Sequence, residues 1–308
     1  MGGTVGSSGV GDWRERAAAH AARADALTAG RRERRSRQGA ADPVDDFLYD
    51  YYSLRPGQLR RWHPGAGAVL LDAADAPHRE WRWYAAREPD GAVALDVAAF
   101  RADRGRAVAT SHRLLGALRG RAPHLGCFGM HEWAMVYRAG DAVGGPSTGG
   151  ASPRGRRHAL PLRLGQAGTD AVVEGHPLRC SHVDAFRFFT PDAAPRNSAV
   201  LTRETQAQSD QPGCVHVSMD VLRHAVALGP ACPGELLLDC FEAARAAREV
   251  DMRASPYDVS GPDGTGLSPI RVETRDGKVA YAAAQRELAA AAAPLRERLL
   301  RVCEEVLG

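Results

Sequence analysis

The chain has almost no side chains that could carry amine chemistry. Lysine and arginine together number 40, and Lys278 is the only lysine. A Schiff-base mechanism needs a nucleophilic amine. Lys278 stands at the start of the last predicted helix, far in sequence from the polar clusters of the chain. We therefore expect no reaction that proceeds through a lysine imine.

Long apolar runs and export signals are also missing. No run approaches the roughly 20 apolar residues that cross a bilayer, and the opening MGGTVGSSGVGDWRER lacks the apolar core of a signal peptide. We expect a cytoplasmic protein without a membrane partner, in which cysteines remain reduced thiols. None of them forms a CxxC pair, which disfavours a thioredoxin-like or zinc-ribbon site. The six cysteines are Cys127, Cys180, Cys214, Cys232, Cys240 and Cys303.

The length and composition predict one globular domain. A chain of 308 residues with 44% hydrophobic content can bury a sizeable core. We expect that domain to span residues 12–308, after a flexible N-terminus at 1–11 and with a flexible loop at about 141–157, where the sequence is DAVGGPSTGGASPRGRR. The net charge of +3 is small, but arginines gather in RRERRSR, LRRW and RGRR. Such patches neutralise phosphates or simply form a solvated surface.

The residue patterns predict an α+β fold. We expect a mixed, largely antiparallel sheet with flanking helices and a long C-terminal helical segment, broken or kinked at Pro294. The predicted helices are residues 13–37, 97–119 and 235–253. The predicted short strands are residues 68–74, 79–87 and 92–97, and two or three more between 161 and 189.

Finer details of two segments bear on the site. In the last of those strands, His182, Asp184 and Phe186 would share one face. The segment QPGCVHVSMDVLRHAVALG is predicted to change from strand to helix, with Ser218 as the cap. Near residue 50, Phe47, Leu48, Tyr51 and Tyr52 have helical spacing, which favours core packing over a ligand platform.

Three segments each place a cysteine close to a histidine and an acid. These side chains perform acid/base chemistry or hold metals. The three sets are Cys127, His131 and Glu132 in GCFGMHEWAMVYR; Cys180, His182 and Asp184 in LRCSHVDAFRFF; and Cys214, His216 and Asp220 in PGCVHVSMD. Each histidine could instead be hydrogen-bonded in a core, and Asp220 could serve a helix N-terminus. Asp251 ends an apolar helical stripe and needs a buried partner, most commonly an arginine.

From about Asp45 to Arg298 the chain resembles a group of actinobacterial proteins named 3-methyladenine DNA glycosylase. The stretches that carry the resemblance are YYSLRPGQLRRWHPG, GCFGMHEWAMVYR, LRCSHVDAFRFFTP, TRETQAQSDQPGCVH and DMRASPYD. The chain has neither an LPGVG-type helix-hairpin-helix nor tandem helical repeats of the HEAT-like kind. Catalytic residues of the glycosylases with those features therefore have no counterpart here.

The resemblance implies a DNA-repair hydrolase that releases an alkylated purine base from duplex DNA without a cofactor. In such chemistry the damaged nucleotide leaves the stack, an aromatic pocket holds the base, and a carboxylate directs water to the sugar carbon. Without a suitable lysine the enzyme would be monofunctional. The candidate catalytic residues are Asp184, Glu132, His182, Asp220 and Asp251. The candidates for base stacking are Trp62, Trp133 and Phe186, and those for phosphate binding are Arg61, Arg187 and Arg203.

Two other functions fit the same residues. One is a zinc or non-haem iron enzyme that acts on a small molecule, with His131, His182 and His216 meeting beside Glu132, Asp184 or a cysteine. Three imidazoles suit catalytic zinc, and two imidazoles with a carboxylate suit iron, although HExxH is absent. The other is a non-catalytic nucleic-acid-binding module that uses the arginine patches.

Overall fold

The computed structural model describes residues 8–39, 41–88, 91–139, 160–261 and 266–308. It is a mostly helical α+β structure with a small sheet and a long C-terminal helix, which confirms the predicted fold class. The α-helices are α1 (Trp13–Ser36), α2 (Asp45–Tyr51), α3 (Pro56–Arg60), α4 (Val97–Ala117), α5 (Met130–Ala134), α6 (Gly165–Glu174), α7 (Val183–Phe186), α8 (Gln206–Ser209), α9 (Val215–Leu228), α10 (Gly234–Ala254) and α11 (Arg275–Leu307). The strands are β1 (Ser8–Val10), β2 (Ala68–Leu70), β3 (Tyr84–Arg87) and β4 (Ala92–Leu95), and short 3-10 turns lie at Pro77–Glu80, Ala194–Arg196 and Gly229–Ala231.

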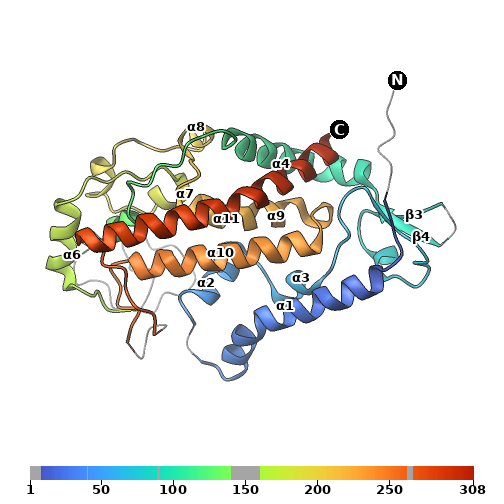
Figure 1. Ribbon diagram of the computed structural model, residues 1–308, viewed down its shortest axis with the longest axis horizontal. Helices are drawn as coiled ribbons and strands as arrows, with labels where there is room; N and C mark the ends of the chain where they lie inside the picture. The colour runs from blue at the N-terminus through green and yellow to red at the C-terminus, as the bar shows by residue number, and fades with distance from the viewer. Residues whose placement is uncertain (1–7, 40, 89–90, 140–159, 262–265) are drawn as a thin grey trace.

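The sheet lies at one end of the molecule, and α6 lies at the other (Figure 1). Its strand order is β1-β2-β4-β3, with β1 and β2 parallel and the other two pairs antiparallel. Leu70 and Val93 of the sheet pack against Trp13 of α1 in one apolar cluster. Each of the three strands predicted between 68 and 97 is found, but in shorter form, and residues 79–80 of the second prediction belong to the 3-10 turn Pro77–Glu80. Residues 8–10 of the predicted flexible terminus form β1, whereas 1–7 and the predicted loop at 141–157 lie outside the described residues.

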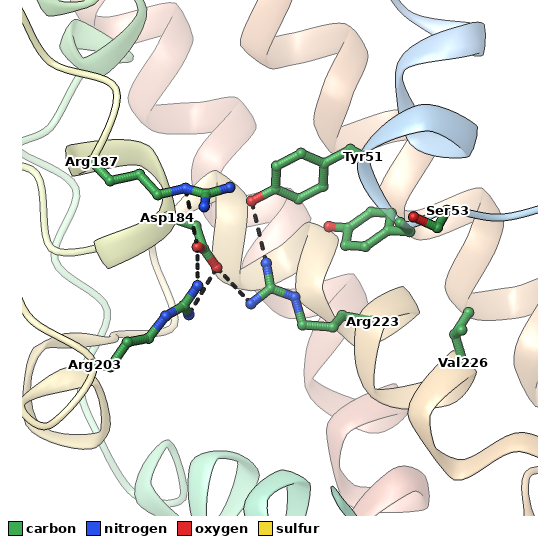
Figure 2. A pocket seen from close by; sticks show the side chains of 8 residues that line it. Tyr51, Ser53, Asp184, Arg187, Arg203, Arg223 and Val226 are labelled. Carbon is green, nitrogen blue, oxygen red and sulfur yellow. Dashed lines mark hydrogen bonds and ion pairs between the residues drawn. The ribbon is translucent and has the colours of Figure 1, made fainter. Parts of the chain in front are cut away.

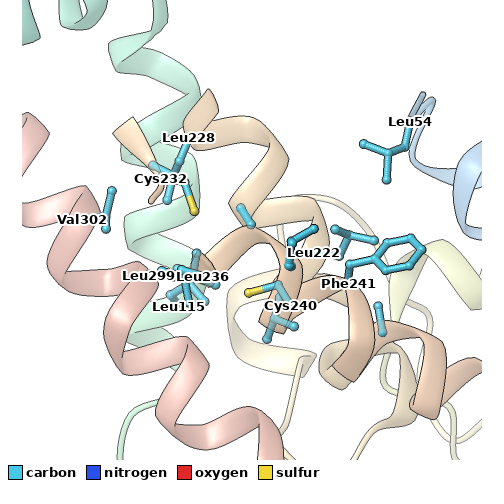
Figure 3. Packing of buried hydrophobic residues seen from close by; sticks show 14 of the residues in the cluster. Leu54, Leu115, Leu222, Leu228, Cys232, Leu236, Cys240, Phe241, Leu299 and Val302 are labelled. Carbon is cyan, nitrogen blue, oxygen red and sulfur yellow. The ribbon is translucent and has the colours of Figure 1, made fainter. Parts of the chain in front are cut away.

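Helices α4, α9, α10 and α11 pack together and enclose the main core. In Figure 3, Leu115 of α4, Leu222 of α9 and Leu299 of α11 approach the α10 side chains Leu236 and Phe241. All five are at most 3% exposed. Since α9 contacts α4, α10 and α11, it is buried along most of its length, and any polar group on it must find a partner inside the protein.

The strands predicted between 161 and 189 are wrong. This region instead forms α6 and α7, joined by irregular chain. On α6 the buried residues are Thr169 and Val173, four apart, which is the spacing of one helical face. His182 is the N-cap of the short helix α7, so His182, Asp184 and Phe186 do not share the face of a strand. Alternation of apolar and polar residues over so short a segment does not distinguish a strand from irregular chain followed by a single helical turn.

Helix α9 begins earlier than its sequence predicts. Its N-cap is Cys214, so Ser218 lies within the helix and Asp220 lies in its second turn. A role of Asp220 at the helix N-terminus is therefore wrong. A Cβ at Gly213 would lie 2.7 Å from the carbonyl oxygen of His124. Glycine therefore allows the segment before α9 to pass close to the backbone at His124.

Helix α11 runs through Pro294 as a single helix of 33 residues. Of the predicted break or kink at Pro294, the break is therefore wrong, and the kink stays a prediction. Near the proline, Arg296 Nη2 donates to the carbonyl oxygen of Ala289 at 3.3 Å, which gives a polar partner to a buried guanidinium. None of the helices in the described ranges combines the length and apolar composition needed to cross a membrane.

His224 of α9 gives the bundle a predictable sensitivity to acid. It is 6% exposed, and its Nδ1 lies 3.1 Å from the Ser111 hydroxyl. Burial lowers its pKa to about 4 from a usual value of 6.5, with Asp220 raising it and Arg223 lowering it. As the pH falls below 6.5, His224 becomes protonated in the unfolded chain before it does so in the folded protein. We expect the free energy of unfolding to drop by up to about 3 kcal/mol from this residue between pH 6.5 and 4.

The variant His224→Gln tests this effect because glutamine can still bond Ser111 but does not titrate. Urea denaturation of both proteins at pH 7, 5.5 and 4.5 should show a shallower loss of stability in the variant. Equal losses in the two proteins would show that His224 does not contribute.

Candidate functional site

A sharp turn before α5 directs its polar side chains inward. Phe128 and Gly129 have φ values of 49° and 69°, and Gly129 is the N-cap of α5. A Cβ at Gly129 would lie 3.1 Å from that of Ala254 on α10, so only glycine fits there easily. Positive φ is uncommon for phenylalanine and often accompanies functional sites. The turn places His131 and Glu132 against α10.

His131, Glu132, Arg248 and Asp251 form a fully buried ionic network, here called the Asp251 cluster. His131 Nε2 is 2.7 Å from Asp251 Oδ1. Arg248 Nη1 donates to Asp251 Oδ2 at 2.6 Å and to Glu132 Oε1 at 3.0 Å. All four residues are at most 2% exposed. The expectation that Asp251 needs a buried partner is confirmed, with a histidine as well as an arginine in that role.

Charge pairing controls protonation in the Asp251 cluster. Burial alone lowers the pKa of His131, but the charge and hydrogen bond of Asp251 raise it to about 10. Burial likewise raises the pKa of Asp251, yet His131 holds it well below the usual range. In this structure His131 and Asp251 therefore form an ion pair inside the protein.

His216 of α9 connects this cluster to a second one. Its ring lies 4.4 Å from that of His131, edge to face, and 5.0 Å from that of His182, nearly parallel. Burial, followed by the charge of His131, keeps the pKa of His216 well below its usual value. Its Nδ1 is buried and has no hydrogen-bond partner among the described residues. His216 is thus a neutral imidazole between the rings of His131 and His182.

The second cluster is built around Asp220, one helical turn after His216. Asp220 Oδ2 lies 3.1 Å from His182 Nε2, and Oδ1 accepts from the Tyr52 hydroxyl at 3.2 Å. Arg223 Nη2 is 3.3 Å from the same Oδ1. Burial alone raises the pKa of Asp220, but Arg223 and His182 together bring it below its usual value. Asp220 is therefore ionised, and it orients groups at the edge of an open pocket.

That pocket, here called the Asp184 pocket, has a volume of about 280 Å³. Figure 2 shows Asp184 at its centre with arginines converging from α7, α9 and the segment before α8. Arg223 Nη1 is 2.7 Å from Asp184 Oδ2, Arg203 Nη1 donates to the same oxygen at 3.0 Å, and Arg187 Nε is 3.5 Å from Oδ1. The lining residues are Tyr51, Tyr52, Ser53, Asp184, Arg187, Arg203, Arg223 and Val226.

Exposure differs sharply within the Asp184 pocket. The side chain of Asp184 is 2% exposed, whereas Arg187 and Arg203 are 55% and 54% exposed. Although burial raises the pKa of Asp184, Arg223 and Arg203 lower it below the usual range. The pocket therefore holds an ionised carboxylate beneath arginines that remain accessible to a ligand.

Several predicted contact residues lie elsewhere. Trp133 is fully buried and donates from Nε1 to the Ala254 carbonyl oxygen, and Trp62 donates to Glu235 beside the sheet. The guanidinium of Arg61 covers the ring of Trp81, 4.9 Å from its centroid. Phe186 packs against Phe189 in a core cluster. None of these four predicted residues lines the Asp184 pocket, so their predicted stacking and phosphate contacts are not supported there.

Four important residues were missing from the candidates. The helical spacing of Tyr51 and Tyr52 favours core packing over a ligand platform, yet both line the pocket. Arg223 and Arg248 each stand three residues from an acid on the same helix, Asp220 and Asp251 respectively. That i,i+3 spacing of opposite charges was the available signal.

The buried cysteines are poor candidates for nucleophiles. All six are unpaired and buried. Burial, reinforced by neighbouring thiols, raises the pKa of Cys180 and Cys214 well above the usual range, so both remain protonated. Cys127 Sγ lies 4.0 Å from His131 Nδ1. The chemistry of the three predicted segments therefore rests on their histidines and acids.

Comparisons of this chain with protein-family models, with curated proteins and with solved structures each found no match. The function is consequently argued from the residues and geometry of the site. Among the described residues, the predicted residues meet in the Asp184 pocket, in the Asp251 cluster and at the His182–Asp220 pair between them.

Proposed function

We propose that the protein is a DNA glycosylase-like hydrolase that releases an alkylated purine base at the Asp184 pocket. The observation that carries this proposal is the joint lining of one open cavity by an acid, three arginines and two tyrosines. Base excision requires a carboxylate near the sugar carbon, aromatic surface for the base, and cations for the flanking phosphates. This pocket offers groups of all three kinds.

In this mechanism Asp184 acts as an ionised carboxylate. Because Arg223 and Arg203 lower its pKa, it stabilises the positive charge that develops on the sugar and orients water, and it does not donate a proton. Tyr51 and Tyr52 supply ring surface against which an extruded base packs. Asp220 accepts a hydrogen bond from Tyr52 and thereby positions that ring.

The arginines give the pocket a means of opening. Arg187 and Arg203 are more than half exposed, so phosphates of DNA can compete with Asp184 for them. Arg223 is 28% exposed and also pairs with Asp220, so it stays in place. Movement of the two exposed arginines onto phosphates would uncover Asp184 for water and the sugar.

The test is release of a methylated purine from alkylated duplex DNA by the purified protein, measured by chromatography of the free base. No lysine lines the pocket, and Lys278 lies in the first turn of α11. We therefore expect abasic sites that break only after alkali treatment. Failure to release any base, or strand cleavage by the protein alone, would contradict the proposal.

Arg203→Gln should weaken binding of alkylated duplex DNA by roughly tenfold at moderate salt. Loss of one phosphate contact should also lower the slope of log Kd against log salt by about 1. Arg119→Gln is a matched control, because Arg119 is half exposed and paired with Glu297 away from the pocket. Fluorescence anisotropy at several salt concentrations would measure Kd and its salt dependence for the two variants and the wild type. Equal effects of the two substitutions would exclude a specific role of Arg203.

A further inference from the structure

We infer that the protein has a second, buried site that binds one divalent transition-metal ion, zinc or ferrous iron, through His131, His216 and Asp251. One ligand atom from each of these residues lies within 4.8 Å of the others. The three side chains come from α5, α9 and α10. None of them lines the Asp184 pocket, so this site goes beyond the proposed glycosylase function.

The donor set suits such an ion. Two imidazoles and one carboxylate are the protein ligands of many zinc sites and of non-haem iron sites. Because only a neutral imidazole binds a metal, the ion would displace the proton that His131 holds against Asp251, and that proton would be released to solvent. Metal–ligand bonds of about 2.1 Å place donors around one ion at most about 4 Å apart, so small side-chain rotations would complete the site. His131, His216 and Asp251 are at most 5% exposed. The two nitrogen donors disfavour cations that prefer oxygen ligands, such as Mg²⁺.

Unpaired polar atoms next to these residues provide a second and independent observation. His216 Nδ1 and Glu132 Oε2 are both buried without a hydrogen-bond partner among the described residues. A buried polar atom left without a partner costs about 1–3 kcal/mol. An ion bound by His216 would give this buried imidazole a polar partner beside its ring contacts with His131 and His182.

Arg248 would serve as the supporting residue of this site. It holds Asp251 Oδ2 at 2.6 Å and Glu132 Oε1 at 3.0 Å. These bonds leave Asp251 Oδ1 directed at His131 and Glu132 Oε2 uncommitted. Such outer contacts fix the orientation of metal-ligating carboxylates. Arg248 is therefore a positioning residue for the ion, and it offsets part of the negative charge of the two acids.

The test uses the purified 308-residue protein, stripped with a chelator and titrated with Zn²⁺ or Co²⁺ alone in a calorimeter. We expect one ion per chain, and absorption bands of Co²⁺ that report nitrogen and oxygen ligands. His216→Gln should weaken binding by roughly 100-fold or more. His224→Gln should bind like the wild type, because His224 is also a buried histidine of α9 but bonds Ser111 instead. Elemental analysis of freshly purified protein would decide between zinc and iron.

Two results would overturn the inference. One is absence of binding by the wild-type protein, which would leave a metal-free network of ion pairs. The other is equal affinity of His216→Gln and wild type, which would place the ion elsewhere. If His216→Gln does not fold, NMR of wild-type histidine signals with Zn²⁺ takes its place. Shifts confined to histidines other than His131 and His216 would likewise refute the site.

Discussion

Arg248→Met should destabilise the protein by about 3–5 kcal/mol, the largest stability loss that we expect from a single substitution. The guanidinium is fully buried and contacts Asp251 and Glu132 through the same Nη1. Methionine keeps a flexible apolar side chain against the ring of Phe47, which the guanidinium carbon approaches to 3.8 Å from the centroid. The substitution would leave one positive partner, His131, for two buried carboxylates. Urea denaturation at pH 7 would measure the loss.

Arg245→Met on the same helix is the matched control. Arg245 is 45% exposed and pairs with Asp45 at 2.7 Å. Exposed ion pairs contribute about 1 kcal/mol or less, so this variant should unfold close to the wild-type midpoint. Both proteins should be measured with chelator present, so that any bound ion is removed from the comparison. Similar losses in the two variants would show that the Asp251 cluster does not depend on Arg248.

Asp184→Asn should lower kcat for base release by about 100- to 10,000-fold, the range expected for loss of a positioned catalytic carboxylate. Asparagine has nearly the same shape but cannot neutralise charge on the sugar. Arg187, Arg203 and Arg223 remain in the pocket, so the affinity for alkylated DNA should stay equal or rise. A large loss of kcat with retained Kd is the expected signature. Single-turnover base release together with anisotropy binding would measure both quantities.

Two further variants make this result specific. Asp103→Asn removes an exposed acid that pairs with Arg82, and it should leave kcat unchanged. Asp220→Asn keeps Asp184 but disturbs the partner of Tyr52 and His182. If Asp220→Asn abolished release while Asp184→Asn did not, Asp220 would be the required carboxylate and the role proposed for Asp184 would be wrong.

Much of the fold could be predicted from local patterns. The helices at 13–37, 97–119 and 235–253 have long apolar periodicity and correspond to α1, α4 and α10. The three short strands between 68 and 97 are also found. The secondary structure from 161 to 189 could not be predicted in the same way, because its apolar patterns extend over only a few residues and fit a strand as well as a helix. There, burial of Thr169 and Val173 by tertiary packing decided in favour of helix.

The site was only partly predictable, for a physical reason. A histidine next to a buried acid indicates chemistry, and the structure indeed brings the rings of His131, His216 and His182 into contact. The arginines that neutralise the acids are more distant, as with Arg248 and Glu132, which are 116 positions apart in the chain. No local pattern relates such partners, because their meeting depends on how α5 packs against α10.

The solitary lysine has a practical consequence for experiments on this molecule. Lys278 lies in the first turn of α11, the helix that ends at Leu307 and packs along α4, α9 and α10. An amine-reactive dye or surface tether would find this one side chain, besides any free α-amino group. With the α-amino group blocked, every labelled copy would be held through the same end of α11, the longest helix of the described residues. Uniform attachment of this kind is what single-molecule fluorescence and oriented immobilisation require.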